Sequence, residues 1–289
     1  METSRDAFVE IAFFGGSFTG IPLEEQKWYL KIGYSYVKSG KVMQLRISTR
    51  PDYITEEILD LLDSYGVKTI ELGAQSLDDE VLSCSNRGHS LEAVTKAAKM
   101  IKSRGFSLGI QTMIGLPRDT IEKDLETAHR VVEIAPDIVR IYPTLVIKDT
   151  YLEKMYSEGS YRPLTIEEAV DISAALLEIY EENNINVIRV GLQPTESISE
   201  NGNVVAGPFH PAFRQLAESK LLLNKMIKYI KANNLENSKD IIIECSSREI
   251  SNIIGQKRKN IITLKREFNF INIKLDINDS KNSFRILKV

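Results

Sequence analysis

The most constraining feature of this sequence is a regular alternation, over its first 190 residues, between short β-branched runs and stretches with helical periodicity. Each apolar run is followed by roughly 10 to 15 residues whose hydrophobic positions recur every three or four residues. Strands that alternate with helices in this way pair in parallel, because each helix returns the chain to the same end of the sheet. The six predicted strands lie at residues 8–14, 43–48, 68–73, 107–114, 137–142 and 185–190.

Residues that start and stop helices stand between these runs. Ser, Thr and Asp are preferred at helix N-termini because their side chains accept a hydrogen bond from a free backbone N–H. Glycine is favoured just past a C-terminus, where the backbone often turns left-handed. The expected N-caps are Thr55, Ser90 and Asp119, a capping box joins Thr165 to Glu168, and Gly66 and Gly105 follow two helix ends.

Small and polar residues follow five of the predicted strands, in the segments GGSFTG, STRPD, GAQS, GLP and YPT. In a closed or partly closed barrel the carboxyl ends of all strands face one mouth, where active sites lie. An open Rossmann sheet uses only the point where the strand order reverses. Five strand ends of this kind therefore favour an α/β fold with a barrel-like parallel sheet over an open sheet.

The segment FFGGSFTG, residues 13–20, does not match the common phosphate-binding loops. Its glycines are adjacent, whereas a dinucleotide-binding turn needs G-x-G-x-x-G and a P-loop needs G-K-[ST]. Glu24 and Glu25 would also repel a phosphate from the following helix. A nucleophile elbow, G-x-S-x-G, would have Thr19 in place of its last glycine. Two interpretations stay open: a tight turn that needs glycine for its backbone alone, or a backbone cradle for the ammonium and hydroxyl groups of a ligand.

Six motifs together resemble the radical S-adenosylmethionine (SAM) superfamily. FFGGSFTG, STRPDY, IELGAQS, SNRGH, IGLP and RIYPTLVIKDT occur in this order between residues 13 and 150. They look most like the radical SAM core of the Elongator catalytic subunit and its bacterial relatives, and are more distantly similar to oxygen-independent coproporphyrinogen oxidase. The resemblance covers roughly residues 8–215 and implies a partial (β/α)6 TIM-like barrel that holds SAM across its strand ends.

The resemblance assigns ligands to both charged groups of the SAM amino-acid moiety. Gly15, Gly16 and Ser17 match the Gly-Gly motif that contacts the SAM amino group in the family. Arg87 matches an arginine that pairs with the SAM carboxylate. A zwitterion needs acceptors for its ammonium and a cation for its carboxylate. Taken alone, Arg87 also fits a surface ion pair.

Four further residues fall at positions that lie near SAM in the family. Ser48 stands where relatives have a polar or acidic residue, Gln75 matches a SAM-contacting glutamine, and Gln111 falls near the ribose or adenine. Arg50 belongs to the shared STRPD motif without a defined role. The alternative for Gln75 is a buried amide that only completes the hydrogen bonding of the barrel interior.

The resemblance also implies a 4Fe-4S cluster, held by a C-x3-C-x2-C loop after the first barrel strand. Such clusters are held by cysteine thiolates. The chain has two cysteines, Cys84 and Cys245, which do not form this loop, and its three histidines show no metal-ligand spacing. We therefore expect an N-terminally truncated form of a longer protein, without the first strand and the cluster loop. As written, it would bind no cluster and generate no radical, and its next strand would be an open edge. No metal ligand or catalytic residue is assigned.

The C-terminal part differs in charge from the rest of the chain. From Lys220 onward there are 15 Lys and Arg against 7 Asp and Glu, whereas residues 1–219 carry 22 against 33. A β-α-α-β pattern here resembles a KH nucleic-acid-binding module, whose G-x-x-G loop clamps the nucleic-acid backbone. Arg258 replaces the second glycine, so the module would be degenerate, with Lys257, Arg258 and Lys259 as candidate phosphate contacts. The alternative is a small packing appendage with a solvated basic turn.

These patterns divide the chain into a barrel at residues 1–215, a connecting helix at 216–238 and a small α+β module at 239–289. The resemblance implies that the full-length form cleaves SAM reductively at its cluster to give a 5′-deoxyadenosyl radical, with tRNA as the implied substrate or partner. The alternatives are a non-catalytic RNA-binding protein and a cluster-free SAM-binding protein.

Composition restricts where such a protein works. No apolar run approaches the roughly 18 residues that a membrane-spanning helix needs, and residues 1–10 lack the pattern of a secretory signal. Two cysteines exclude a disulfide framework. A cytoplasmic protein without a membrane partner is expected.

Overall fold

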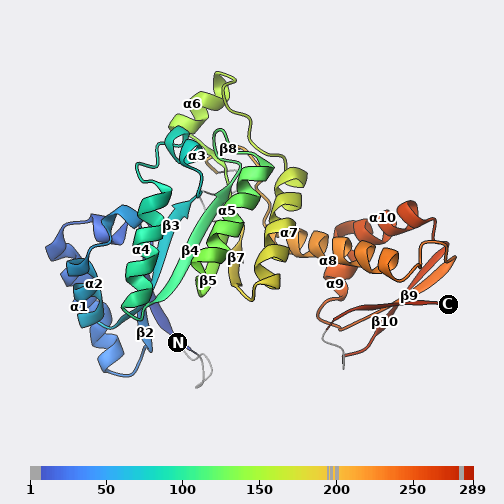
Figure 1. Ribbon diagram of the computed structural model, residues 1–289, viewed down its shortest axis with the longest axis horizontal. Helices are drawn as coiled ribbons and strands as arrows, with labels where there is room; N and C mark the ends of the chain where they lie inside the picture. The colour runs from blue at the N-terminus through green and yellow to red at the C-terminus, as the bar shows by residue number, and fades with distance from the viewer. Residues whose placement is uncertain (1–7, 194, 196–197, 199–201, 280–282) are drawn as a thin grey trace.

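The computed structural model describes residues 8–193, 195, 198, 202–279 and 283–289. Its larger part is a six-stranded parallel sheet with the order β1-β2-β3-β4-β5-β7, covered on its outer side by helices (Figure 1). The sheet confirms the predicted partial barrel, and each predicted strand is present. The strands are β1 (Glu10–Phe13), β2 (Gln44–Thr49), β3 (Val67–Gln75), β4 (Ser107–Ile114), β5 (Ile138–Pro143) and β7 (Asn186–Val190).

The sheet is curled, so that strands far apart in its order approach each other across a concave interior. Phe14, just past β1, packs against Arg140 of β5 with 4.8 Å between the ring centroid and the guanidinium carbon, although three strands lie between β1 and β5. Side chains alternate between the two faces of each strand. On β2, Leu45 and Ile47 are fully buried in the hydrophobic core, whereas Arg46 bonds to Glu71 of β3 across the concave face. This alternation places polar side chains inside the half-barrel.

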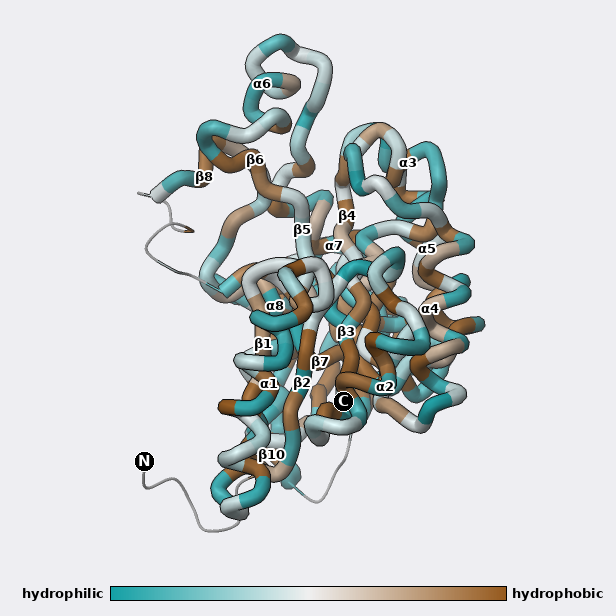
Figure 2. Tube along the Cα trace, turned by 90° about the vertical axis from the view of Figure 1, so that its left-hand side faces the viewer, coloured by the Kyte–Doolittle hydropathy of each residue, from teal (hydrophilic) through white to brown (hydrophobic). Residues whose placement is uncertain are grey.

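The helices of the barrel bury one apolar face against the sheet and expose the other. In Figure 2, hydrophobic residues run along the strands, whereas α4 and α5 alternate hydrophobic and hydrophilic residues. This pattern is typical of helices that cover a core on one side only. The helices are α1 (Leu23–Lys38), α2 (Glu56–Ser64), α3 (Asp79–Cys84), α4 (Leu91–Ser103), α5 (Ile121–Ile134) and α7 (Ile166–Glu182).

Most predicted helix caps are confirmed. The side chains of Thr55 and Ser90 accept hydrogen bonds from the third residue of their helices, and the capping box between Thr165 and Glu168 is present. The prediction for α5 was wrong by one residue. Its N-cap is Thr120, whose backbone is extended, while Asp119 lies in the preceding turn and accepts from the N–H groups of Leu116 and Thr120.

Several short elements were not predicted. The turns η1 (Phe18–Gly20) and η2 (Pro51–Tyr53) follow β1 and β2. A two-stranded antiparallel sheet joins β6 (Val146–Ile147) to β8 (Val204–Ala206), with helix α6 (Tyr151–Ser157) beyond β6. Each of these elements has seven residues or fewer, which is too short for a periodic pattern to be recognised.

The C-terminal part has a three-stranded sheet and a hydrophobic core of its own. Helix α8 (Phe213–Ala232) leads to it from the barrel (Figure 1). The central strand of this sheet is β9, which pairs in parallel with β10 and antiparallel with β11. The predicted β-α-α-β order is present, and β11 is an additional strand. The elements are β9 (Asp240–Cys245), α9 (Ile250–Ile254), η3 (Gln256–Arg258), α10 (Lys259–Phe268), β10 (Asn272–Ile277) and β11 (Arg285–Lys288). The division into a barrel at residues 1–215, a connecting helix at 216–238 and a small module at 239–289 stays a prediction. None of the described helices is long and apolar enough to cross a membrane.

Candidate functional site

The carboxyl ends of the barrel strands surround a hollow of about 860 Å³. The residues that sequence comparison connects with SAM come from four different strand ends and from the loop after α3. The structure brings all of them to the wall of this one hollow: Gly15, Gly16, Ser17, Ser48, Arg50, Gln75, Arg87 and Gln111. Their convergence is a property of the curled sheet.

The Gly15–Gly16–Ser17 segment forms an open backbone edge beside the hollow. Gly15 has a φ of +104°, a conformation that L side chains rarely adopt, so this position needs glycine for its backbone. Gly16 has no such φ, and a Cβ there would meet no atom within 4 Å. The tight-turn interpretation therefore accounts for Gly15 but not for Gly16. The open space at Gly16 suits the close approach of a ligand to the backbone.

Gln75 and Gln111 form a pair on adjacent strands. The Nε2 group of Gln111 donates to Oε1 of Gln75 at 3.1 Å. Gln75 is buried and has a φ of +67°, where β3 shifts its register against β4. A non-glycine residue in this region is strained and persists only where its surroundings hold it.

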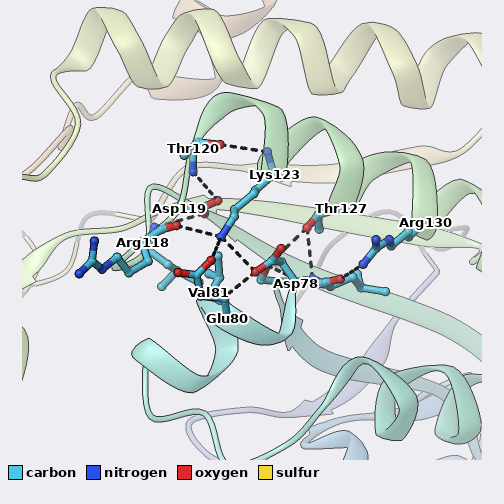
Figure 3. Close-up of polar contacts among 12 residues, drawn as sticks. Asp78, Glu80, Val81, Arg118, Asp119, Thr120, Lys123, Thr127 and Arg130 are labelled. Carbon is cyan, nitrogen blue, oxygen red and sulfur yellow. Dashed lines mark hydrogen bonds and ion pairs between the residues drawn. The ribbon is translucent and has the colours of Figure 1, made fainter.

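Helix α5 supplies that support, as Figure 3 shows. The hydroxyl of Thr127, which is buried, accepts from the backbone N–H of Leu77 and lies 3.4 Å from the Ser76 hydroxyl. Lys123 bonds to Glu80 at 2.6 Å and lies 3.3 Å from Asp78. These contacts fix the turn after Gln75 and the short helix α3, which leads to the loop of Arg87.

Arg87 is a half-buried cation without an acidic partner among the residues that the structure describes. Its Nε is buried and lacks a hydrogen bond, and among the described residues its guanidinium donates only from Nη2 to the Met113 sulfur, at 3.7 Å. Burial, and then the charge of Arg50, lower the pKa of Arg87. The surface ion pair that was the alternative for Arg87 is therefore not formed, and the side chain is available to an anionic ligand.

Arg50 differs from Arg87 because its charge is already matched. Its Nε and Nη2 donate to the two carboxylate oxygens of Asp52 at 2.9 and 2.8 Å. The side-chain hydrogen bond with Asp52 raises the pKa of Arg50. A Cβ at Gly88 would lie 3.0 Å from Nη2 of Arg50. Arg50 thus belongs to the wall of the hollow as half of an ion pair.

Sequence reasoning missed a network of ion pairs inside the barrel. Glu71 on β3 is 2% exposed. Its carboxylate accepts from Nη1 of Arg46 at 2.8 Å and lies 2.7 Å from Nε of Arg140 on β5. Nη1 of Arg140 donates in turn to the Tyr142 hydroxyl at 3.3 Å. Charged residues at every second position of apolar strands were the signal, because they mark the polar inner face of a curled sheet.

Two more wall residues were missed. Arg189 of β7 lines the hollow and donates from Nη1 to Oε1 of Gln193 at 3.1 Å. His89 stands two positions after Arg87 in the SNRGH motif, with Nε2 3.0 Å from the carbonyl of Ala74. Burial lowers the pKa of His89, so its imidazole is neutral near pH 7.

A pair of carboxyl groups lies behind the turn that follows β4. Asp124 of α5 is 4% exposed, and burial, then the nearby charge of Asp119, raise its pKa to about 10. Burial also raises the pKa of Asp119. Asp124 is therefore protonated near pH 7, which lets it hydrogen-bond to the Asp119 carboxylate. The pair fastens the turn of Gly115 and Leu116 to α5, next to the Met113 side of the hollow.

The residues present do not fit an iron–sulfur cluster. Cys84 ends α3 and Cys245 is buried in β9 of the C-terminal part. A cluster takes three or four closely placed thiolates. The described residues also contain no group of three His, Cys, Asp or Glu that would hold a metal ion.

The basic turn of the C-terminal module is exposed. Lys257 and Arg258 have φ values of 51° and 62°, and η3 joins directly to α10. The predicted loop at residues 255–260 is therefore a tight turn with left-handed backbone at Lys257 and Arg258, and α10 already begins at Lys259. Nζ of Lys259 lies 3.9 Å from the Glu167 carboxylate of α7.

Two family profiles match the chain. The Radical SAM superfamily profile matches residues 3–131, and the Radical SAM C-terminal domain profile matches residues 136–222. The matched ranges include the six strands of the barrel and the first half of α8.

Similar proteins carry names connected with tRNA and Elongator. The chain is 32% identical over 184 residues to tRNA uridine(34) acetyltransferase of Methanocaldococcus infernus, covering 57% of this chain and 34% of the relative. It is 29% identical over 191 residues to Homo sapiens Elongator complex protein 3, covering 59% and 35%. The chain thus spans about a third of the length of these relatives.

A solved structure shares the architecture. The archaeal Methanocaldococcus infernus Elp3 with N-terminus deletion (1–46) superposes with a TM-score of 0.64 at 26% identity, covering 78% of this chain and 54% of that chain. The likeness agrees with the motifs in the strand ends and with the partial barrel.

Proposed function

The chain belongs to the radical SAM superfamily, and on this basis we propose that the hollow at the carboxyl ends of its strands binds S-adenosylmethionine. The observation that supports this proposal most strongly is the half-buried guanidinium of Arg87, which has no carboxylate partner among the described residues. A desolvated cation of this kind is costly unless a ligand supplies the anion.

The other wall residues fit the remaining groups of SAM. The open edge at Gly15 and Gly16, with the Ser17 hydroxyl, offers acceptors for the ammonium. The Gln75–Gln111 pair offers amide donors and acceptors for ribose hydroxyls or the adenine edge. Thr127 holds the turn at Ser76 and Leu77, and Lys123 holds the start of α3 through Asp78 and Glu80. These contacts position the Arg87 loop, which reduces the ordering that a ligand must impose.

In the superfamily, SAM supplies radical chemistry when it is cleaved reductively at a 4Fe-4S cluster. Cys84 and Cys245 do not provide the thiolates for such a cluster. The contribution proposed for these 289 residues is therefore to bind SAM, to orient it and to limit its contact with water. Thiolate ligation and electron delivery are not assigned to residues of this chain.

We further propose tRNA as the substrate class. This assignment is supported by relatives named as a tRNA uridine(34) acetyltransferase and as Elongator complex protein 3. The acetyl transfer in the first name is not proposed for this chain, which spans about a third of that relative.

Calorimetric titration with SAM and with decarboxylated SAM tests the role of Arg87. The protein should bind SAM about tenfold or more tightly than the analogue, because only SAM offers a carboxylate to the guanidinium. Arg87→Ala should lose this preference, whereas Arg87→Lys should keep part of it. Arg104→Ala is the matched control, since Arg104 pairs with Glu56 near the opposite end of the barrel.

The outcomes separate two failures. A wild-type protein that binds neither compound would contradict SAM binding itself. Equal affinity of the wild-type protein for both compounds would contradict the assignment of Arg87 while leaving the hollow as a ligand site.

A second candidate function is RNA binding by the C-terminal module. It is favoured by the exposed basic turn between α9 and α10, which occupies the place of the clamp loop in a β-α-α-β module. Lys257 and Arg258 have no acidic partner among the described residues, while Lys259 lies near Glu167. This function requires RNA affinity that falls as salt rises and that depends on residues 255–259.

A further inference from the structure

One side of the hollow is not accounted for by the residues that would hold SAM. The SAM candidates lie on the ends of β1 to β4 and in the loop after α3. The wall formed by β5 and β7 instead presents Arg140, Tyr142, Arg189 and Gln193. These two strands are neighbours in the sheet, with Arg140 in register with Arg189.

The charges around the hollow are out of balance. Four arginines line it, and none of the described residues in its wall is Asp or Glu. Arg50 is matched by Asp52 and Arg140 by Glu71 below the wall. Arg87 and Arg189 have no carboxylate partner within the described chain. SAM brings one carboxylate together with a sulfonium and an ammonium, so it can match one of these two guanidinium groups and adds positive charge beside the other.

The guanidinium of Arg189 has a neutral partner. Its Nη1 donates to Oε1 of Gln193 at 3.1 Å, which leaves its other N–H groups available to a ligand. Arg140 is tied to Glu71 and donates to the Tyr142 hydroxyl at 3.3 Å. The phenol proton of Tyr142 is then free to point at an acceptor in the hollow. Two donors of this kind suit an oxyanion.

An aromatic surface lies beside these donors. The ring of Phe14 is 51% exposed and packs against the Arg140 guanidinium at 4.8 Å. An exposed aromatic ring beside an arginine plane is a stacking surface for a nucleobase. The volume of about 860 Å³ is near the upper end of the roughly 300 to 1,000 Å³ typical of small-ligand pockets, which leaves room beside SAM.

We propose that Arg189, with Tyr142 and Gln193, forms a phosphate subsite for a nucleotide that enters the hollow beside SAM, with its base against Phe14. The proposal rests on the proposed function for the choice of RNA as the source of the nucleotide. Its core, an anion subsite on the β5–β7 wall, rests on the charges and contacts of this chain.

Binding of two phosphate probes tests the subsite in the full chain. One probe is a tRNA transcript and the other is uridine 5′-monophosphate, each titrated with and without SAM over a range of salt concentrations. Arg189→Ala should weaken binding about tenfold and reduce the salt slope for tRNA by about 1. Arg189→Lys should keep most of the slope, because it keeps the charge. Arg104→Ala, which removes the same charge near the opposite end of the barrel, should change neither.

Each outcome decides the proposal. If Arg189→Ala weakens binding of both probes, the result supports a subsite for one nucleotide. If it weakens binding of tRNA alone, the result supports a subsite for the RNA chain. Unchanged binding of both probes in Arg189→Ala, or binding of neither by the wild-type protein, overturns it. SAM affinity, measured in the same variant, should not fall, because Arg189 is assigned to no group of SAM. If the wild-type protein fails to bind SAM, the proposed function fails, while the titrations without SAM still decide the subsite.

Discussion

The barrel mouth and the C-terminal basic turn both contain several basic side chains, but the two regions differ in how far these side chains are buried. Arg87 and Arg189 are half-buried, and both line the same hollow. Lys257 and Arg258 are exposed on a tight turn. Basic side chains therefore lie in two different environments: the arginines of the barrel are partly desolvated, and the basic side chains of the turn are in contact with bulk water.

We infer that the burial of a charged group, and not the number of charged groups, makes a site specific for its ligand. A desolvated guanidinium has lost water and gains strongly from a matching anion. An exposed lysine keeps its hydration, and its attraction to phosphates is screened by salt within about 8 Å at physiological ionic strength. Loss of a single charged group should therefore have a large effect on the stability and ligand binding of the barrel, and a small effect on those of the module.

The largest expected effect is on barrel stability in Glu71→Ala. This change leaves Arg140 without its carboxylate partner inside the barrel, and Arg46 then keeps only Glu10 at 2.5 Å. Breaking a buried ion pair in this way costs about 3 to 5 kcal/mol. Urea unfolding followed by the fluorescence of Trp28, the single tryptophan, measures the barrel directly.

The matched change in the module is Glu267→Ala. Glu267 pairs with Lys231 at 3.5 Å, and both side chains are substantially exposed. Exposed pairs contribute less than about 1 kcal/mol. Equal losses in the two variants, each followed by circular dichroism, would contradict the contrast between the two regions.

The next effect is a pH dependence of the unfolding free energy, which has opposite signs in the two regions. The folded pKa of Asp124, about 10, is raised above its unfolded value of about 3.9. Its stabilising contribution is complete below the unfolded pKa and is lost as pH rises toward 10, with a limiting slope of about 1.4 kcal/mol per pH unit. Asp124→Asn should therefore remove this loss and raise the unfolding free energy near pH 8.

Asp279 of the module provides the comparison. A hydrogen bond from the backbone N–H of Ser247 lowers the pKa of this exposed carboxyl. Its contribution is present above the unfolded pKa and is lost as pH falls through the lower folded value. Asp279→Asn should thus lower the unfolding free energy only above about pH 4. Unfolding curves from pH 4 to 9 that are parallel for the wild-type protein and Asp124→Asn would disprove the assignment of a protonated Asp124.

The smallest effect is expected from Arg258→Gly in the basic turn. Arg258 adopts a φ of 62°, and glycine relieves a strain of about 1 kcal/mol there. The module should become slightly more stable, while RNA affinity falls and its salt slope decreases by about 1. Filter binding at several salt concentrations measures this, with Lys274→Ala on β10 as a control for charge. A slope that is the same as in the wild-type protein would remove the turn from the RNA interface.

Local patterns predicted the elements of this fold well. Strand positions followed from β-branched runs, and the caps at Thr55, Ser90 and Thr165 followed from side chains that bond within a few residues. The cap of α5 was placed one residue early because Asp119 and Thr120 are both good caps, and only the backbone decides between them. Strand β11 was missed because four residues of RILK carry too little periodicity.

From the sequence alone, strand–helix alternation and the shared motifs identified Gly15, Gly16 and Gln75 at strand ends, and Arg87 in the SNRGH motif, as candidates for one site. Only the tertiary structure decided which of their charges are matched. Arg50 meets Asp52 and Arg140 meets Glu71, whereas Arg87 and Arg189 find no such partner in the described chain. The physical reason is that, apart from the near neighbours Arg50 and Asp52, these contacts depend on residues far apart in the chain, such as Glu71 and Arg140, which the folded sheet brings together. No local pattern encodes such contacts.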